Sequence, residues 1–382
     1  MITCDVVVVG CGGVGSAAVM HLARRGLRVV GLDRFTPPHD RGSSHGRTRM
    51  IRQAYFEHAD YVPLVLRAYR LWSELEQAAA TKLYHETGLL EIGPPDGAVV
   101  PGVMAAAARH GLDVSQLSAN DVRRNFPGFV VADGMIAAYE RRAGYLRVEQ
   151  CIAAHLDQAR AAGAVIRSEE SVQHWNATGS GVVVTTDREQ YRANKLVITA
   201  GPWAATLLED LNIALHVRRK PQYWFGPAAE SYRADRGCPA FLYETRDAQR
   251  RDAGVFYGFP IVGPEGLKCA EHSGGGDVAD PLNLNRDVDD ADLGRVRGFL
   301  NNSLPGVTTT LVDHAACMYT MSPDENFIVD RHPRHNQVVF AAGLSGHGFK
   351  FTSVLGEALA DLATTGSTEL PIGFLGLKRF QS

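Results

Sequence analysis

The glycine-rich run Gly10-Cys-Gly-Gly-Val-Gly15 constrains the fold of this chain more than any other segment. Residues 5–9 before it are a short β-branched run, which is typical of a buried parallel strand. Residues 16–25 after it have the composition of a helix, and a second apolar run, residues 28–32, ends at Asp33. This order of segments predicts a β-α-β unit at the start of the chain.

Each glycine has a physical role in such a unit. Gly10 permits a tight turn, Gly12 lets the backbone approach a pyrophosphate, and Gly15 allows the helix to pack closely on the strand. The helix N-terminus offers N–H groups to the phosphates. Asp33 lies 18 residues after Gly15, where a carboxylate can accept hydrogen bonds from a ribose diol. The unit therefore predicts a dinucleotide site, but it does not distinguish NAD from FAD.

Two further segments bear on the kind of dinucleotide. Small, polar and cationic residues fill the stretch 42–55, which could lie over the ring of the dinucleotide or form a solvated basic loop. Cys317 precedes a second glycine-rich stretch, residues 343–348. A nicotinamide enzyme has no need of a cysteine beside its cofactor, whereas a flavin enzyme can use one as a covalent tether. The alternative is a small buried apolar side chain, which describes most lone cysteines.

Length, charge and cysteine content narrow the class of protein. The 382 residues suit two domains or one large interleaved unit. A net charge of -3 without a broad basic face argues against nucleic acid as a partner. The six cysteines are dispersed, and His332 and His335 flank a proline in a way that fits a turn better than a metal site, so no metal is expected. The first apolar run is too short for a signal core or a membrane span. We expect a cytoplasmic protein with reduced thiols and no membrane partner.

The remaining pattern predicts two interleaved units. Helices are expected at residues 61–76, from 144 to about 162, and around Leu355. Short strands are expected near 88–93, 165–166, 182–185, 195–199 and 338–342. Residues 215–317 contain aromatic-rich runs separated by turns, which favour an antiparallel sheet. The predicted class is α/β, in a two-domain α+β arrangement. The nucleotide-binding domain would comprise 1–85, 145–215 and 318–382, and the substrate domain 86–144 and 216–317.

Taken together, the sequence resembles the monomeric sarcosine oxidase and N-methyltryptophan oxidase family of FAD-dependent amine oxidases. The resemblance extends from the first strand to the last residues. The segments that carry it are 10–15 with Asp33, 42–52 (Gly-Ser-Ser-His-Gly-Arg-Thr-Arg-Met-Ile-Arg), 257–260 (Tyr-Gly-Phe-Pro), 317–319 (Cys-Met-Tyr) and 343–350 (Gly-Leu-Ser-Gly-His-Gly-Phe-Lys). Arg47 departs from the family, which usually has aspartate there. The resemblance implies a Rossmann-like FAD-binding domain interleaved with an antiparallel-sheet substrate domain.

The resemblance also implies which residues hold the cofactor. Cys317 would bond through sulfur to the flavin 8α-methyl carbon, His45 and Arg49 would lie against one face of the flavin ring, and backbone N–H groups near His347 would reach its pyrimidine edge. The complete cofactor set is Gly10, Gly12, Gly13, Val14, Gly15, Asp33, Arg34, Ser44, Thr48, Gly201, Cys317, Gly343, Gly346, His347, Gly348 and Lys350.

For the substrate, the resemblance implies a clamp of Arg52 and Lys350 on a carboxylate; their alternative is an ordinary ion pair. Lys268 would supply positive charge near flavin N5 for the reaction with O2, unless it faces solvent. The substrate side would be lined by Tyr257, His272 and Tyr319. The catalytic set that the resemblance implies comprises these three residues with Lys268, Arg49 and His45.

The implied activity is oxidation of a secondary N-methyl amino acid, such as sarcosine or N-methyltryptophan. The substrate would give an imine that water hydrolyses to formaldehyde and the primary amino acid, with O2 reduced to H2O2. The alternatives are an oxidase or dehydrogenase of a cyclic amine such as pipecolate, a non-catalytic flavoprotein, and a nicotinamide dehydrogenase. The family is often monomeric, so a monomer is expected.

Overall fold

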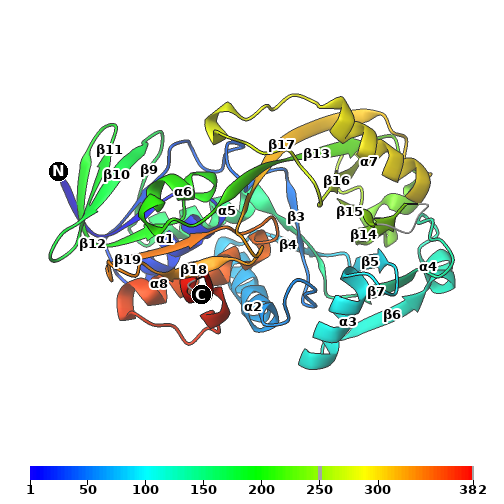
Figure 1. Cartoon of the computed structure of the whole chain (residues 1–382), viewed down its shortest axis with the longest axis horizontal. Coiled ribbons are helices and arrows are strands. Elements are labelled where there is room, and N and C mark those ends of the chain that lie inside the picture. The colour runs from blue at the N-terminus through cyan, green and yellow to red at the C-terminus, as the bar shows by residue number, and fades with distance from the viewer. Residues whose placement is uncertain (248–251, 381–382) are drawn as a thin grey trace.

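Two eight-stranded sheets dominate the computed structural model, which describes residues 1–247 and 252–380. Figure 1 shows the first sheet with its helices on the left of the molecule and the second sheet on the right, with the long strands β13 and β17 running between them. A three-stranded sheet lies between the two large ones. None of the helices in the described ranges is both long enough and apolar enough to cross a bilayer.

The first sheet contains the predicted β-α-β unit. Its strand order is β10-β11-β12-β1-β2-β9, with β19 paired to β12 and β18 paired to β19. The strands are parallel from β19 through β12, β1 and β2 to β9, and the remaining pairs are antiparallel. Their bounds are β1 Ile2–Val9, β2 Val29–Leu32, β9 Val165–Arg167, β10 Val172–Ala177, β11 Val182–Thr186, β12 Gln190–Ile198, β18 Ile328–Arg331 and β19 Val338–Ala342.

Helices cover the first sheet and pack on one another. They are α1 (Gly13–Arg24), α2 (Tyr61–Ala79), α5 (Val148–Ala161) and α8 (Thr352–Thr365), and the short α6 (Ala204–Leu207) follows β12. Buried apolar residues of α1, α2, α5 and α8 share one core with β1. The Trp72 indole N–H of α2 donates to the Lys350 carbonyl at 2.9 Å, which ties α2 to the turn before α8.

The second sheet has the order β17-β13-β16-β15-β14-β5-β7-β6. It is antiparallel, as predicted, except for the parallel pair of β14 and β5. Its helices are α3 (Val99–His110), α4 (Ala119–Asn125) and α7 (Asp290–Ser303), and Phe299 of α7 stacks on Phe256 at 4.4 Å between ring centroids. The strands are β5 Leu89–Gly93, β6 Val114–Ser118, β7 Ile136–Glu140, β13 His216–Phe225, β14 Ala240–Arg246, β15 Asp252–Phe259, β16 Leu267–Glu271 and β17 Leu311–Met321.

The small sheet corrects one expectation. The helix predicted from residue 144 begins only at Val148, because residues 144–147 form β8 between β3 (Thr48–Ile51) and β4 (Tyr84–Glu86). A Cβ atom on Gly144 would lie 2.0 Å from the carbonyl oxygen of His85, so the close approach of β4 needs glycine there. The domain boundaries proposed from the sequence stay a prediction; β17 runs across the one placed between residues 317 and 318.

Candidate functional site

A cavity of about 430 Å³ opens at the carboxyl ends of the parallel strands of the first sheet and extends to the second sheet. Ligands of open α/β sheets bind at this edge. The predicted residues that line it are Gly10, Gly12, Gly13, Val14, Asp33, Arg34, Ser44, Arg49, Arg52, Gly201, Tyr257, His272, Tyr319, Gly343, Gly346, His347, Gly348 and Lys350. Five further predicted residues do not line the cavity: Gly15, His45, Thr48, Lys268 and Cys317.

The glycine turn after β1 has the geometry that the motif predicts. Gly10 has φ +86°, and a Cβ atom there would lie 2.5 Å from the Thr199 carbonyl oxygen. A Cβ atom on Gly15 would lie 1.7 Å from the Gly10 carbonyl oxygen, so only glycine allows α1 to begin this close to β1. At Gly12 the nearest atom to a Cβ would be Ser44 Oγ, 3.9 Å away. The protein therefore leaves open, on the cavity side of Gly12, the space that a diphosphate needs.

The Asp33 carboxylate organises the edge of the cavity. Its oxygens accept the Cys11 N–H at 2.7 Å and the Phe35 N–H at 2.9 Å, and His39 Nε2 lies 3.2 Å away. The side chain is buried and lines the cavity. Asp33 thus holds the ends of two loops in place, and its predicted contact with a ribose stays a prediction.

Three buried polar atoms of cavity-lining residues have no hydrogen-bond partner within the described chain. They are the indole nitrogen of Trp203 and the hydroxyl oxygens of Thr320 and Thr352. Buried polar groups are almost always paired, so these atoms point to a polar ligand. The ribose hydroxyls, phosphates and ring carbonyls of FAD supply donors and acceptors of this kind, and the residues present fit that cofactor. None of the three belonged to the predicted set, because a lone threonine or tryptophan carries no motif.

Cys317, Arg49 and His45 come together beside the cavity. Arg49 Nη2 lies 3.2 Å from Cys317 Sγ, and its Nη1 donates to Gln222 Oε1 at 3.2 Å. Burial, then the positive charge of Arg49, lowers the pKa of His45 to about 3, so His45 is neutral at physiological pH. Its Nε2 is buried without a hydrogen-bond partner in the described chain. The buried thiol, the guanidinium and the neutral imidazole thus lie together beside the cavity, and of the three residues Arg49 lines it.

Lys268 is buried, which rules out the solvent-facing alternative. Its ammonium donates to the carbonyl oxygens of Gly46 at 2.6 Å and Thr48 at 3.0 Å. Burial, followed by the charge of Arg49, holds the pKa of this ammonium well below its usual range. The surroundings of Lys268 therefore disfavour its protonated form. A lowered lysine pKa of this kind is typical of functional lysines.

Arg52 and Lys350 both line the cavity and both are buried. Arg52 forms a 2.5 Å ion pair with Glu57, a cavity-lining residue that the motifs did not reveal, and lies 3.5 Å from Glu91. Lys350 Nζ donates to the His347 carbonyl at 2.9 Å. The sequence left open whether Arg52 binds a substrate carboxylate or forms an ordinary ion pair. In this structure it forms an ion pair, and its partner Glu57 lines the cavity.

The pKa values in this group spread widely. Burial opposes ionisation of Glu57, yet Arg52 lowers the pKa of this carboxyl to about 2. Burial raises the pKa of Glu91 to about 8, and burial together with Arg52 lowers the pKa of Lys350 to about 7. Glu57 is thus ionised at neutral pH, Glu91 is mostly protonated, and Lys350 titrates there. Perturbed groups of this kind are concentrated at functional sites.

Tyr257 of β15, Tyr319 of β17 and His272 in the turn after β16 form an aromatic wall at the second sheet. His272 Nδ1 lies 3.4 Å from the Tyr319 hydroxyl, and the rings of Tyr257 and His272 are 6.4 Å apart. Burial lowers the pKa of His272 to about 3, so the imidazole is neutral. Gly346 lies against Tyr319, since a Cβ atom there would be 2.2 Å from the ring. Trp224 does not belong to this wall, because it packs against Arg47 and Lys268 outside the cavity lining.

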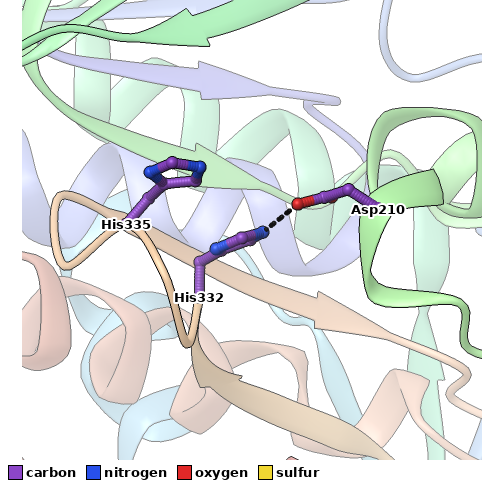
Figure 2. Close-up of side chains that lie close together, drawn as sticks. All are labelled: Asp210, His332 and His335. Atoms are coloured by element: carbon purple, nitrogen blue, oxygen red, sulfur yellow. Dashed lines mark hydrogen bonds and ion pairs between the residues drawn. The ribbon is translucent and has the colours of Figure 1, made fainter.

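A second group of ionisable side chains lies away from the cavity, where Asp210, His332 and His335 converge (Figure 2). His332 Nε2 is 2.9 Å from Asp210 Oδ2, and its Nδ1 accepts the Arg334 N–H at 3.3 Å. Neutral His332 therefore carries its proton on Nε2 and donates it to Asp210, which the Arg334 guanidinium also contacts. Asp210 and His332 are thus paired with each other and with Arg334, and we infer no metal site from this group.

The sheet edge, the glycine turn and the unpaired polar atoms define the class of protein: an α/β protein with a dinucleotide cavity between two sheets. Residues 5–362 match the family model described as FAD dependent oxidoreductase, so the chain belongs to that family. It is an FAD-dependent oxidoreductase, as predicted.

Relatives with assigned names span the whole chain. The monomeric sarcosine oxidase of Streptomyces avermitilis is 40% identical over 99% of this chain and 98% of its own length. The N-methyl-L-tryptophan oxidase of Salmonella enteritidis is 37% identical over 98% of this chain and 99% of its own. The resemblance stated from the motifs is confirmed.

Solved structures agree. The open form of NikD, described as an unusual amino acid oxidase essential for nikkomycin biosynthesis, superposes with a TM-score of 0.87 at 29% identity and covers 98% of both chains. Glycine oxidase from Geobacillus kaustophilus has a TM-score of 0.80 at 19% identity over 99% of both chains, a likeness of fold alone. The predicted fold class is confirmed.

Proposed function

We propose that this protein is an FAD-dependent oxidase of secondary, N-methyl amino acids. The observation that carries the proposal is the placement of Arg52 and Lys350 in one cavity wall, facing the same space as Tyr257 and His272. Two cations suit a carboxylate, and neutral polar aromatic groups suit an amine. The names of the full-length relatives, sarcosine oxidase and N-methyl-L-tryptophan oxidase, support the same substrate class.

The carboxylate would bind in competition with Glu57. The Arg52 guanidinium carries more than one donor pair, so it can turn from Glu57 to a substrate carboxylate without leaving its buried position. Glu91 behind it is mostly protonated at neutral pH and does not neutralise Arg52 a second time. Lys350 must be protonated to assist, and a bound carboxylate favours that state.

The amine would lie near His272 and Tyr319. With a pKa of about 3, His272 brings no positive charge, so it can accept a hydrogen bond from the substrate amine or donate one to it. The aromatic wall excludes water from the carbon that loses hydrogen. This environment favours the neutral amine, the form in which the nitrogen lone pair assists oxidation.

FAD, when bound, accepts two electrons from the substrate and passes them to O2. We propose that it is held by the glycine turn, the orphan hydroxyls and a thioether from Cys317. Forming the sulfur–carbon bond removes one hydrogen each from the thiol and the methyl group, and the two electrons go to O2. Arg49, 3.2 Å from the sulfur, would stabilise the thiolate. Lys268 would supply the positive charge for the oxygen step.

An oxidase of a cyclic or otherwise unusual amino acid is the second candidate, because NikD superposes over the whole chain at 29% identity. Cytoplasmic location and the monomeric state stay predictions.

The direct test is oxygen uptake by purified protein with a set of N-methyl amino acids, cyclic amino acids and the corresponding esters. We expect uptake with H2O2 and formaldehyde formation for N-methyl amino acids and none for their esters, which lack the carboxylate. Uptake restricted to cyclic amines would select the second candidate. If the protein takes up no oxygen but reduces an artificial electron carrier when substrate is added, it is a dehydrogenase instead.

A further inference from the structure

Arg47 lies in the segment 42–52 between β2 and the end of β3, and its backbone is unusual. It has φ +68°, a left-handed conformation that side chains other than glycine seldom adopt. The turn is held by Glu149 of α5, whose Oε1 accepts the N–H groups of Gly46 at 2.7 Å and Arg47 at 3.1 Å. Such strain persists only where neighbouring contacts enforce it.

The Arg47 side chain lies across the second sheet. Its Nη2 donates to Asp313 at 2.6 Å, its Nε lies 3.7 Å from Glu265, and its guanidinium carbon is 4.5 Å from the centroid of the Trp224 ring. Asp313 of β17 and Trp224 of β13 face each other across the two strands. Arg47 is therefore anchored by an ion pair at one end and by an aromatic face along its length.

Lys268 is the other cross-strand neighbour of Trp224. It pairs with Trp224 between β16 and β13, and its ammonium lies 5.1 Å from the centroid of the same ring. That ammonium donates to the carbonyls of Gly46 and Thr48, the residues immediately before and after Arg47. Arg47 is thus the central residue of a turn whose two outer carbonyls hold Lys268.

We propose that Arg47 is a positioning residue for Lys268: its anchorage on Asp313 and Trp224 holds the turn 46–48 so that the two carbonyls aim the ammonium. The inference rests on the proposed function, in which Lys268 serves the reaction with O2. It adds a consequence for the charge of the site, because Arg47 puts a further positive charge beside the lysine, in addition to that of Arg49.

The charge of Arg47 acts together with several other groups. Burial lowers the pKa of Lys268 most, Arg49 of β3 lowers it next, and Arg47 acts in the same direction. Glu149 and Cys317 act in the opposite direction, and the imidazole of His45, which also faces Lys268, is neutral. Replacing Arg47 by a carboxylate should therefore let Lys268 keep its proton to higher pH.

The experiment compares Arg47→Asp, Arg47→Lys and Asp313→Asn with the wild-type holoenzyme. Reduction of the flavin by substrate without air and its reoxidation by O2 are measured separately across pH. The control is Arg233→Ala, since Arg233 resembles Arg47 in exposure (40% against 37%) and in its ion pairs with an aspartate at 2.8 Å and a glutamate at 3.5 Å. Arg233 lies in the connection between β13 and β14, away from the turn 46–48, and does not line the cavity.

Lys268 can be followed without turnover. The chain has six lysines, so carbon-13 labelling of lysine gives few signals, and Lys268→Met identifies the one of interest. We expect Arg47→Asp to move the titration of Lys268 upward by about one pH unit. The alkaline fall of the reoxidation rate should move by the same amount, while reduction by substrate stays unchanged.

The other variants separate position from charge. Arg47→Lys keeps the charge and should leave the titration of Lys268 in place. Asp313→Asn keeps Arg47 but removes its ion pair with residue 313. This variant should reoxidise its flavin several-fold more slowly at pH values where Lys268 is protonated. If Lys268 titrates and the flavin reoxidises in these variants as in the wild type and in Arg233→Ala, the inference is wrong. If the wild type itself does not react with O2, the proposed function fails instead.

Discussion

Single residues decide what the cavity can bind. A Cβ atom at Gly12 would meet no atom of the described chain closer than 3.9 Å, whereas a Cβ atom at Gly15 would lie 1.7 Å from a backbone oxygen. The two glycines belong to the same motif. Gly12 leaves space in the cavity for a ligand, whereas Gly15 allows the backbone of α1 to approach that of Gly10. Their sequence positions are sufficient to predict both roles, since the turn that joins a strand to a helix is local.

We expect Gly12→Ala to weaken FAD binding at least tenfold without changing the stability of the apoprotein. Gly15→Ala should destabilise the apoprotein itself, by about 1–3 kcal/mol or more, because the clash is with backbone that cannot turn away. Fluorescence titration with FAD and denaturant unfolding of the apoprotein separate the two effects. Equal losses of stability in both variants would contradict this division of roles.

Lys350 should give carboxylate binding a pH dependence. Its pKa of about 7 in the ligand-free protein means that binding of a carboxylate above pH 7 must also take up a proton. The dissociation constant of a simple carboxylate, followed by the flavin spectrum, should be constant below pH 7 and rise about tenfold per pH unit above it. Ionisation of Glu91, with a pKa of about 8, adds to the rise.

The Lys350→Met variant should bind the carboxylate weakly at every pH. Its dissociation constant should no longer rise from pH 7, and only the rise caused by ionisation of Glu91 should remain. Lys195→Met, outside the cavity lining, is the control. A dissociation constant that changes with pH in the same way in both variants would remove Lys350 from the clamp.

At the scale of elements, close packing of helices places the cavity walls. Gly356 of α8 lies against α1, since a Cβ atom there would be 2.5 Å from Ala17 Cβ and 2.7 Å from its carbonyl carbon. The α1–α8 contact fixes the N-terminus of α1, where the glycine turn ends, next to the turn that carries Lys350. Helix periodicity in the sequence predicts both helices but not which glycine lies between them.

Gly356→Ala should destabilise the protein by about 1–3 kcal/mol, since overpacking exceeds the gain of about 1 kcal/mol in helix propensity. Gly298→Ala in α7 is the matched control, because no atom lies within 4 Å of a Cβ there. That variant should be stabilised by about 0.5–1 kcal/mol. Urea unfolding measures both, and a stabilised Gly356→Ala would mean that α1 and α8 lie farther apart.

At the scale of the whole molecule, the cavity joins segments from residue 9 to residue 352 and from both large sheets. A ligand in it therefore contacts parts of the chain that are far apart in sequence. Binding to the folded state alone raises the free energy of unfolding by mass action.

The variant Cys317→Ser should release FAD on denaturation and rebind it, whereas the wild type should retain the flavin. At FAD concentrations of 100 times its dissociation constant, the free energy of unfolding of Cys317→Ser should rise by about 2.7 kcal/mol. Denaturant midpoints with and without FAD measure this. Release of the flavin from the wild type on acid precipitation would disprove the thioether.

What the sequence by itself determined is local: the β-α-β unit, the glycine turn, Asp33 at the end of β2, and the motifs that mark the family. These depend on residues close in the chain, where backbone geometry leaves few choices. Even locally, the strand at 144–147 was missed, because its partners β3 and β4 are distant segments.

Only the tertiary structure decided which charges face one another. The ion pair of Arg52 with Glu57, the carbonyls that hold Lys268 and the anchorage of Arg47 on Asp313 each join residues whose types are common and whose spacing carries no pattern. Such contacts depend on how the two large sheets approach. Burial between the sheets is also the largest cause of the shifted pKa values of Glu91, Lys268 and Lys350. That is why sequence motifs point to single residues of the cavity wall, whereas the partners and the protonation of its charged groups depend on the tertiary structure.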